Sequence, residues 1–201
     1  MRAATRAVPD RNLAVFAPAQ KPVLVYTDAS ANGFKVRIGA LLVADGDEFF
    51  CTVLDPDDHI ATPWKCREDS DVAITPAEPY AVLVAFQTFE VHSRGRDVFW
   101  FIGNQAAGAC FAKAGSQVPA LSLLALRATS LMGAMGCRVW AEYVLSTDYF
   151  VGALSREGLE DTALAAKIAA GGWRYVPPCR DAALEVAGLD FESIWTRRAH
   201  S

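Results

Sequence analysis

The sequence lacks the long apolar run of a membrane helix and the paired cysteines of a disulfide or zinc framework. No stretch approaches the ~20 consecutive apolar residues that a membrane span needs. Its five cysteines are scattered, odd in number and without a Cys-x-x-Cys pair, which favours reduced, mostly buried thiols. No secretory signal is visible. These absences predict an intracellular protein, in which the Arg/Ala-rich start at residues 1–11 is a hint of an organelle.

Basic charge is also scarce. The chain has 19 Lys and Arg against 23 Asp and Glu, with a net charge of −4. A domain that grips a nucleic-acid backbone usually presents a basic face. Nucleic acid is therefore a possible partner but not the favoured one. The candidates for a local basic patch are Arg94, Arg96, Lys113 and Arg127. The three histidines have no ligand spacing and are expected at the surface.

The bulk composition predicts one folded domain with extensions. The chain has 201 residues, of which 52% are apolar, and this length allows a sizeable core. The content of Ala, Val and Leu is higher than a solvated enzyme needs, which fits a protein that buries part of its surface against other protein subunits. We expect an N-terminal arm at 1–21, a domain at 22–157 and a helical C-terminal tail at 158–201 that serves as a docking extension.

The order of predicted elements indicates an α/β fold. Apolar runs bounded by turn residues predict strands at 22–29, 36–44, 48–54, 97–102 and 137–145. Helical patterns predict helices from about 75 to 92, 104 to 114 and 118 to 135, from about 149, and at 159–170 and 180–198. Three meandering strands followed by alternating helices and strands predict a mixed five-stranded sheet with helices on both faces.

Two acids stand at informative places in this pattern. Asp28 ends the first apolar run, where it is either a site residue or a turn-bonding residue. Glu78 opens the first long helix, where Thr75 fits the N-cap and Pro76 the first helical position. Glu78 is therefore either a site residue or the acid of a capping box. Two later segments look built to carry carboxylates but hold Gly103 and Gly152.

Four segments between residues 22 and 157 carry these positions. They are Tyr26-Thr-Asp-Ala-Ser30 with Ile38-Gly-Ala-Leu-Leu42, Glu78-Pro-Tyr-Ala81, Phe99-Trp-Phe-Ile-Gly-Asn-Gln-Ala-Ala107, and Ser146-Thr-Asp-Tyr-Phe-Val-Gly-Ala-Leu-Ser-Arg156. In order and spacing they resemble the ribonuclease H domain of retrotransposon reverse transcriptases, including its domesticated relatives. The family has an Asp-Asn pair in the third segment, and Asn, Pro, Ala, Asp and then Ser-Arg in the fourth. The sequence departs from both patterns.

The resemblance implies a ribonuclease H-like fold and a site of four carboxylates that holds two Mg²⁺ ions on the scissile phosphate. Carried over, the first two acids are Asp28 and Glu78, and the other two fall on Gly103 and Gly152. Glycine has no side chain to ligate a metal. We therefore expect no cofactor, or Mg²⁺ if activity remains, and treat Asp28 and Glu78 as vestigial catalytic and metal residues. Asp97 or Asp148 would replace the lost acids only if the local geometry shifted.

Three functions compete at this stage. The first is a catalytically degenerate descendant that acts as a structural or assembly subunit of a larger complex. The second is a working ribonuclease that cuts RNA in RNA–DNA hybrids with rearranged ligands. The third is a nucleic-acid-binding module that retains the binding groove but no longer cleaves. The absent acids and the acidic charge favour the first.

Overall fold

The computed structural model describes residues 21–32, 35–45, 48–56, 74–113, 115–116, 119–145 and 151–179. These ranges contain a six-stranded mixed sheet in the order β5-β4-β1-β2-β3-β6. The strands are β1 (Val23–Asn32), β2 (Lys35–Ala44), β3 (Glu48–Leu54), β4 (Asp97–Ile102), β5 (Arg138–Tyr143) and β6 (Trp173–Tyr175). The first three strands form an antiparallel meander, while β4 runs parallel to β1, β5 to β4, and β6 to β3.

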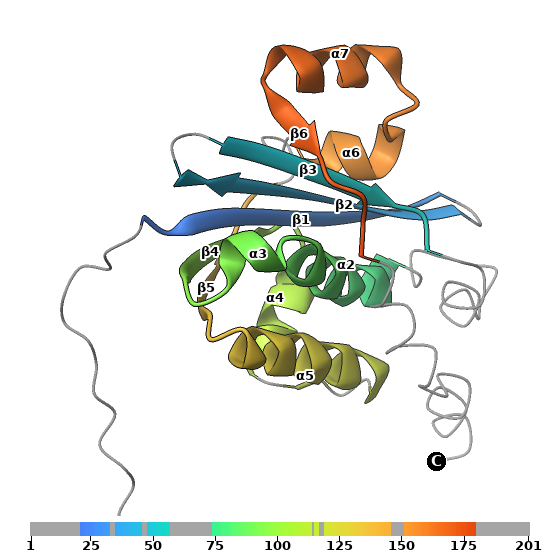
Figure 1. The fold of residues 1–201 in the computed structure, drawn as a ribbon. Coiled ribbons are helices and arrows are strands. Elements are labelled where there is room, and N and C mark those ends of the chain that lie inside the picture. The colour runs from blue at the N-terminus through green and yellow to red at the C-terminus, as the bar shows by residue number, and fades with distance from the viewer. Residues whose placement is uncertain are drawn as a thin grey trace, which may run out of the picture.

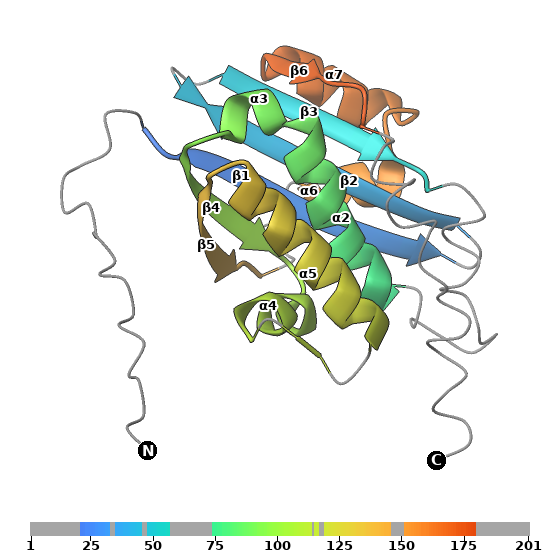
Figure 2. The ribbon, with the colours of Figure 1, turned by 60° about the horizontal axis from the view of Figure 1, so that its bottom comes forward.

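Helices cover both faces of this sheet. They are α2 (Ile74–Thr88), α3 (Glu90–Ser93), α4 (Gln105–Ala112), α5 (Pro119–Ala134), α6 (Val151–Glu157) and α7 (Thr162–Ala170). Figure 1 shows α2 to α5 on one face, and α6 and α7 on the other. Figure 2 shows β5 and β6 at opposite edges of the sheet. The predicted α/β class, with a mixed sheet between two helical layers, is confirmed.

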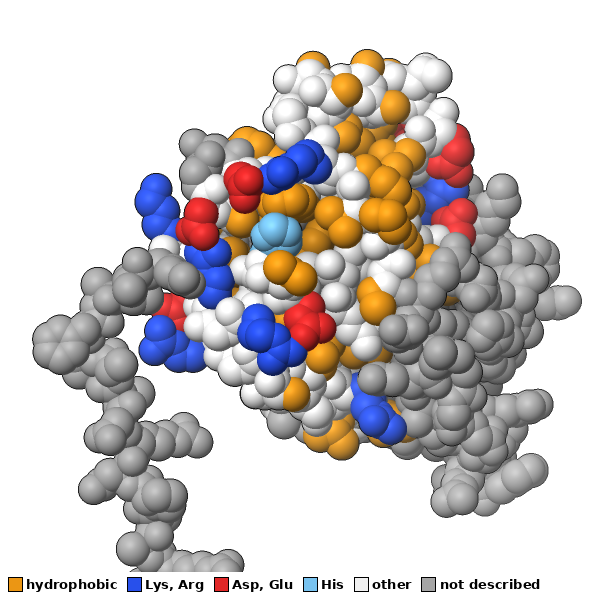
Figure 3. Space-filling model, in the orientation of Figure 1, with side chains coloured by type: hydrophobic (Ala, Val, Ile, Leu, Met, Phe, Trp, Pro, Cys, Tyr) orange, Lys and Arg blue, Asp and Glu red, His pale blue; other side chains and the backbone are white. Residues whose placement is uncertain are grey.

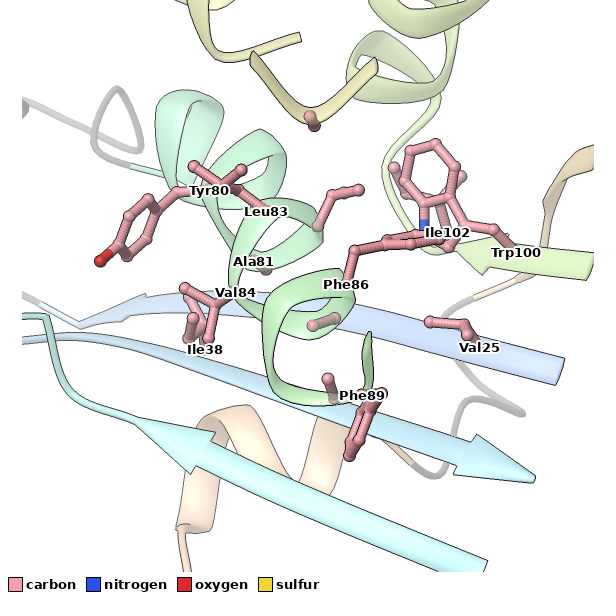
Figure 4. Packing of buried hydrophobic residues seen from close by; sticks show 14 of the residues in the cluster. Val25, Ile38, Tyr80, Ala81, Leu83, Val84, Phe86, Phe89, Trp100 and Ile102 are labelled. Atoms are coloured by element: carbon pink, nitrogen blue, oxygen red, sulfur yellow. The ribbon is translucent and has the colours of Figure 1, made fainter. Parts of the chain in front are cut away.

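Helix α2 organises the main core. Its residues from Pro76 to Phe86 are all buried, because the helix lies between the sheet and α5. Such all-round apolarity is typical of a buried helix. In Figure 4, Val84 of α2 meets Ile38 of β2, and Phe86 points toward Trp100 of β4. The indole N–H of Trp100 donates to the Thr27 hydroxyl over 2.8 Å, so this buried polar group is paired.

The strand β4 shows how alternation places the aromatic cluster. Val98, Trp100 and Ile102 are fully buried under α2, whereas Phe99 and Phe101 lie on the opposite face. There Phe101 stacks on Tyr26 with the ring centroids 4.6 Å apart. The second core under α6 and α7 includes Leu154 and Leu164. The cluster of Phe99, Trp100 and Phe101 thus belongs to the sheet, with Trp100 buried and the two phenylalanines partly buried.

Two local predictions differ from the structure. Helix α2 begins at Ile74, so Thr75 lies inside the helix rather than at its N-cap. A sixth strand, β6, was not predicted because its three residues, Trp173–Tyr175, are too few to show a period. This strand and α7 lie in the predicted C-terminal tail, and β6 is paired with β3 of the sheet. Residues 1–20 of the predicted arm and the predicted helix at 180–198 lie outside the described residues.

Candidate functional site

The fold brings Asp28, in the second half of β1, near Glu78 of α2. Asp28 lies on the strand face that meets α6, and Glu78 lies in α2 on the other side of the sheet. The negative charge of Asp28 acts on Glu78, and the backbone N–H of Ala29 donates a hydrogen bond to the Glu78 carboxyl. Glu78 thus joins α2 to β1. Whether the two acids once bound metal stays a prediction.

Glu78 is the more buried of the two acids. Glu78 is only 4% exposed. Burial, together with the nearby charge of Asp28, raises the pKa of its carboxyl to about 9. The carboxyl atom Oε2 has no hydrogen-bond partner among the described residues. Desolvation disfavours the charged form of an acid. With no cation bound, burial and the charge of Asp28 therefore favour the neutral form of Glu78.

Asp28 is held by helix α6. The hydroxyl of Ser155, itself fully buried, donates a hydrogen bond to Oδ2 of Asp28. Burial raises the pKa of Asp28, while the Ser155 hydrogen bond and the positive charge of Arg156 oppose that rise. The Ser30 hydroxyl in turn donates to the backbone carbonyl of Ser155. One oxygen of the Asp28 carboxylate is thus committed to the contact between β1 and α6.

Gly39 allows that close contact. It lies directly opposite Asp28 in the β1–β2 register. A β-carbon at Gly39 would lie 2.9 Å from Cβ of Leu154 and 3.0 Å from the backbone nitrogen of Ser155. A glycine inside a strand often marks such a close approach. Any larger residue at this position would push α6 away from Asp28.

The guanidinium of Arg156 lies next to the α-carbon of Gly152. A β-carbon at position 152 would lie 2.9 Å from one terminal guanidinium nitrogen of Arg156 and 3.0 Å from the other. The guanidinium therefore lies where an acidic side chain at 152 would begin. The charge of Arg156 reaches Asp28 and lowers its pKa. A positive group thus stands beside Asp28, on the side from which the family's fourth carboxylate would come.

The remaining predicted positions contribute no acid. Gly103 follows β4 at the end of the sheet where Thr27 pairs with Ile102, so it is close to Asp28. Asn104 begins α4 as its N-cap, accepting from the backbone of Ala107 over 3.0 Å, as predicted. Asp97 is at the opposite end of β4 and pairs with Arg138 at 2.5 Å, so it does not replace an acid at Gly103. Asp148 lies outside the described residues.

These donors do not fit the two Mg²⁺ ions that the resemblance implies. Mg²⁺ requires several oxygen ligands in near-octahedral geometry. Only two of the four expected carboxylates are present, and one oxygen of Asp28 already accepts a hydrogen bond from Ser155. Among the described residues, no group of three His, Cys, Asp or Glu side chains is placed to hold a metal ion.

Two of the four residues of the candidate basic patch are paired with acidic side chains. Arg94 pairs with Glu90 one turn away, and Arg96 pairs with Asp45 at 2.6 Å. Lys113 and Arg127 are exposed on α4's end and on α5. Basic and acidic side chains are interspersed on the face shown in Figure 3, without a continuous basic stripe. Within the described part of the chain, no helix is long and apolar enough to cross a membrane.

Three residues of the site had no role assigned from sequence. Ser155 and Arg156 were visible as a Ser-Arg pair, and Gly39 as a glycine between apolar strand residues. The glycine was the available signal, since a strand-interior glycine suggests that another backbone comes close. Ser155 is 127 residues from Asp28 and 125 residues from Ser30 in the chain, yet it is hydrogen-bonded to both. Such contacts follow from topology rather than from local pattern.

Comparison with known proteins identifies the fold. Neither a scan of protein-family models nor a search of curated proteins finds a match to the sequence. Among solved structures, ribonuclease H1 from Halobacterium salinarum matches with a TM-score of 0.52 and 18% identity over 71% of this chain and 100% of its own. The N-terminal ribonuclease H domain of a Mycobacterium tuberculosis protein, solved as a maltose-binding-protein fusion, matches with a TM-score of 0.51 and 11% identity over 72% and 98%. The chain therefore has a ribonuclease H-like fold.

Proposed function

We propose that this chain is a catalytically degenerate ribonuclease H-like protein of retroelement origin, which acts as a structural or assembly subunit of a larger complex. The observation that carries this proposal is that Gly103 and Gly152 stand where the resemblance places the third and fourth carboxylates. Without those two side chains, half of the oxygen donors that would hold Mg²⁺ are missing. The order of the four sequence segments supports the retroelement origin.

The chemistry of the two acids supports the loss of cleavage. A nuclease of this class needs ionised carboxylates that are free to bind metal, and several helices and strands contribute them. Here Ser155 donates a hydrogen bond to one oxygen of Asp28, and glycine stands at the other two expected positions. The site has the interactions of a structural junction, in which α2, β1 and α6 are bound to one another. Preserved shape without preserved ligands favours use as a scaffold.

The surface supports protein partners over nucleic acid. Several large apolar side chains are exposed, notably Trp140 at 56%, Leu126 at 61% and Val91 at 88%. Two of the four candidate basic residues, Arg94 and Arg96, are paired with acids. Exposed apolar groups beside neutralised charge are typical of surfaces that contact protein.

A cleavage assay tests the proposal. The full chain is incubated with a labelled RNA–DNA hybrid in Mg²⁺ or Mn²⁺, beside Asp28→Asn and an active ribonuclease H as positive control. We expect no cleavage above the background of Asp28→Asn. Cleavage by the wild type that Asp28→Asn abolishes would show a working nuclease. Tight hybrid binding that weakens steeply with salt, without cleavage, would favour the nucleic-acid-binding alternative.

A further inference from the structure

Strand β5 (Arg138–Tyr143) forms an open edge of the sheet. It pairs with β4 on one side, and no other described strand lies on its second side. Figure 2 shows this strand at the margin of the sheet, away from α6 and α7. An unpaired edge presents backbone donors and acceptors to any extended segment that meets it. The sequence of β5 contains neither proline nor lysine, two common ways to block such pairing.

The backbone of β5 is oriented for a second partner. The N–H of Arg138 donates to the Arg96 carbonyl and that of Val144 to the Ile102 carbonyl, each over 3.0 Å. Even-numbered residues of the strand therefore direct their backbone groups toward β4. Because backbone groups alternate in direction along a strand, those of Val139 and Ala141 point outward from the sheet.

Apolar side chains flank this edge. Trp140 is 56% exposed, Tyr143 is 43% exposed, and Leu145 just beyond the strand is 63% exposed. Trp140 lies beside Phe99 of β4, with ring centroids 6.2 Å apart, and so continues the aromatic surface of the sheet outward. Large apolar groups clustered at an open edge indicate a protein contact.

We propose that β5 pairs antiparallel with β5 of a second copy of this chain, about a two-fold axis at Trp140. This register sets Trp140 against its own copy and sets Val139 opposite Ala141 of the second copy. The outward backbone groups of Val139 and Ala141 then exchange hydrogen bonds across the axis. The two six-stranded sheets become one continuous sheet. A two-fold contact of this kind uses the same surface on both copies.

Charge complementarity selects this register. With the axis at Trp140, Arg138 lies opposite Glu142 of the second copy, and this occurs twice. An axis at Arg138 or Glu142 would set like charges against each other, and an axis at Val139 or Ala141 would set a charge against Trp140. Arg138 already pairs with Asp97 at 2.5 Å. In the dimer it lies between two carboxylates on the same face.

Sedimentation of the full chain over a range of concentrations tests this proposal. The wild type is expected to be a dimer that dissociates on dilution. Arg138→Glu sets glutamate against Glu142 twice and is expected to weaken the dimer about ten-fold or more. Glu142→Arg should do the same, and the double variant Arg138→Glu with Glu142→Arg should restore the dimer.

Arg174→Glu is the matched control. Arg174 also lies in an edge strand, β6, is similarly exposed, and pairs with Glu48 of the neighbouring strand at 2.6 Å. It should leave the dimer unchanged. A wild type that stays monomeric, a dimer insensitive to Arg138→Glu, or a double variant that is folded by circular dichroism yet monomeric would each overturn the proposal.

Cross-linking tests the register separately. Directly opposite residues in a non-hydrogen-bonded antiparallel pair have Cβ atoms about 4.5–5.5 Å apart. Trp140→Cys should therefore form a disulfide between the two introduced thiols under mild oxidation, identified by peptide mass spectrometry. Absence of that cross-link in a dimeric variant would overturn the axis at Trp140. The dimer does not depend on whether the chain cleaves nucleic acid, so failure of one proposal leaves the other intact.

Discussion

At the scale of single residues, Asp28 and Glu78 lie close together but differ in how their burial is compensated. Asp28 receives the Ser155 hydroxyl and the charge of Arg156, both of which favour its ionised form. Glu78 receives one backbone hydrogen bond, which does not offset its burial and the repulsion from Asp28. Two like-charged acids in one site titrate apart for this reason.

The raised pKa of Glu78 predicts a pH-dependent stability. Its pKa is about 9 in the folded chain and about 4.3 in an unfolded one. Between these values the folded state holds a proton that the unfolded state has lost, so the free energy of unfolding falls as pH rises. Glu78→Gln has no titrating carboxyl at this position. Its free energy of unfolding, relative to that of the wild type, should therefore increase from pH 5 to pH 9 by up to about 1.4 kcal/mol per pH unit.

Urea unfolding at several pH values measures this difference. Glu157→Gln, at an exposed position of α6, is the control and should follow the wild-type profile. Parallel pH profiles for wild type and Glu78→Gln would show that Glu78 is ionised in the folded protein at neutral pH. The neutral-carboxyl assignment would then be wrong.

The Ser155 hydroxyl gives a second prediction. Ser155→Ala leaves the buried Asp28 carboxylate without its donor, and an unsatisfied buried group costs about 1–3 kcal/mol. We expect the free energy of unfolding to fall by that amount in denaturant titrations at pH 7. Ser130→Ala, at an exposed position of α5, should change it by less than about 0.5 kcal/mol. Equal stability of wild type and Ser155→Ala would mean that Asp28 does not depend on this bond.

At the scale of elements, the approach of α6 to β2 depends on Gly39. Gly39→Ala places a methyl group within 2.9 Å of Cβ of Leu154 and 3.0 Å of backbone in α6. Because backbone yields little, overpacking should cost about 1–3 kcal/mol. Gly133→Ala, in α5 with no atom within 4 Å of the added methyl, should instead stabilise by about 0.5–1 kcal/mol. Thermal unfolding of both variants checks the contrast, and equal shifts would show that α6 is not held close to the sheet.

The sequence pattern predicted some elements well and others poorly, for identifiable reasons. Strands β3 and β4 fall at the predicted residues, 48–54 and 97–102, because turn residues and alternation bound them. The start of α2 was misplaced because Thr75-Pro76 has the chemistry of a helix start although the helix begins at Ile74. β6 has three residues and no period. Asp28 and Glu78 could be found as acids within apolar segments, although the structure places both inside their elements, β1 and α2. The Ser155 and Arg156 contacts required the tertiary structure.

At the scale of the whole molecule, a ribonuclease H-like fold surrounds a junction rather than an open acidic cluster. The acids that remain join β1 to helices on both faces of the sheet, through Ala29 to α2 and through Ser155 to α6. The described sheet ends in two edge strands, the six-residue β5 and the three-residue β6. In the proposed account, the shape is kept for assembly, and the open edge is where a second copy joins.

Restoring the missing acids should reopen the site. Gly103→Asp with Gly152→Asp adds two carboxylates, and the flexible end of Arg156 can move aside to pair with an aspartate one turn before it. The double variant should bind Mn²⁺, which takes the same oxygen ligands as Mg²⁺. The matched variant Gly103→Asn with Gly152→Asn has similar side-chain volume without added charge and should not gain binding.

Calorimetric titration of the wild-type chain with Mn²⁺ tests the loss of the metal site most directly. We predict no saturable binding to the wild type at millimolar Mn²⁺, with the restored Gly103→Asp, Gly152→Asp variant as the positive comparison. Saturable binding to the wild type that disappears in Asp28→Asn would show that Asp28 still holds a metal ion, which would contradict the assignment of this site as a structural junction.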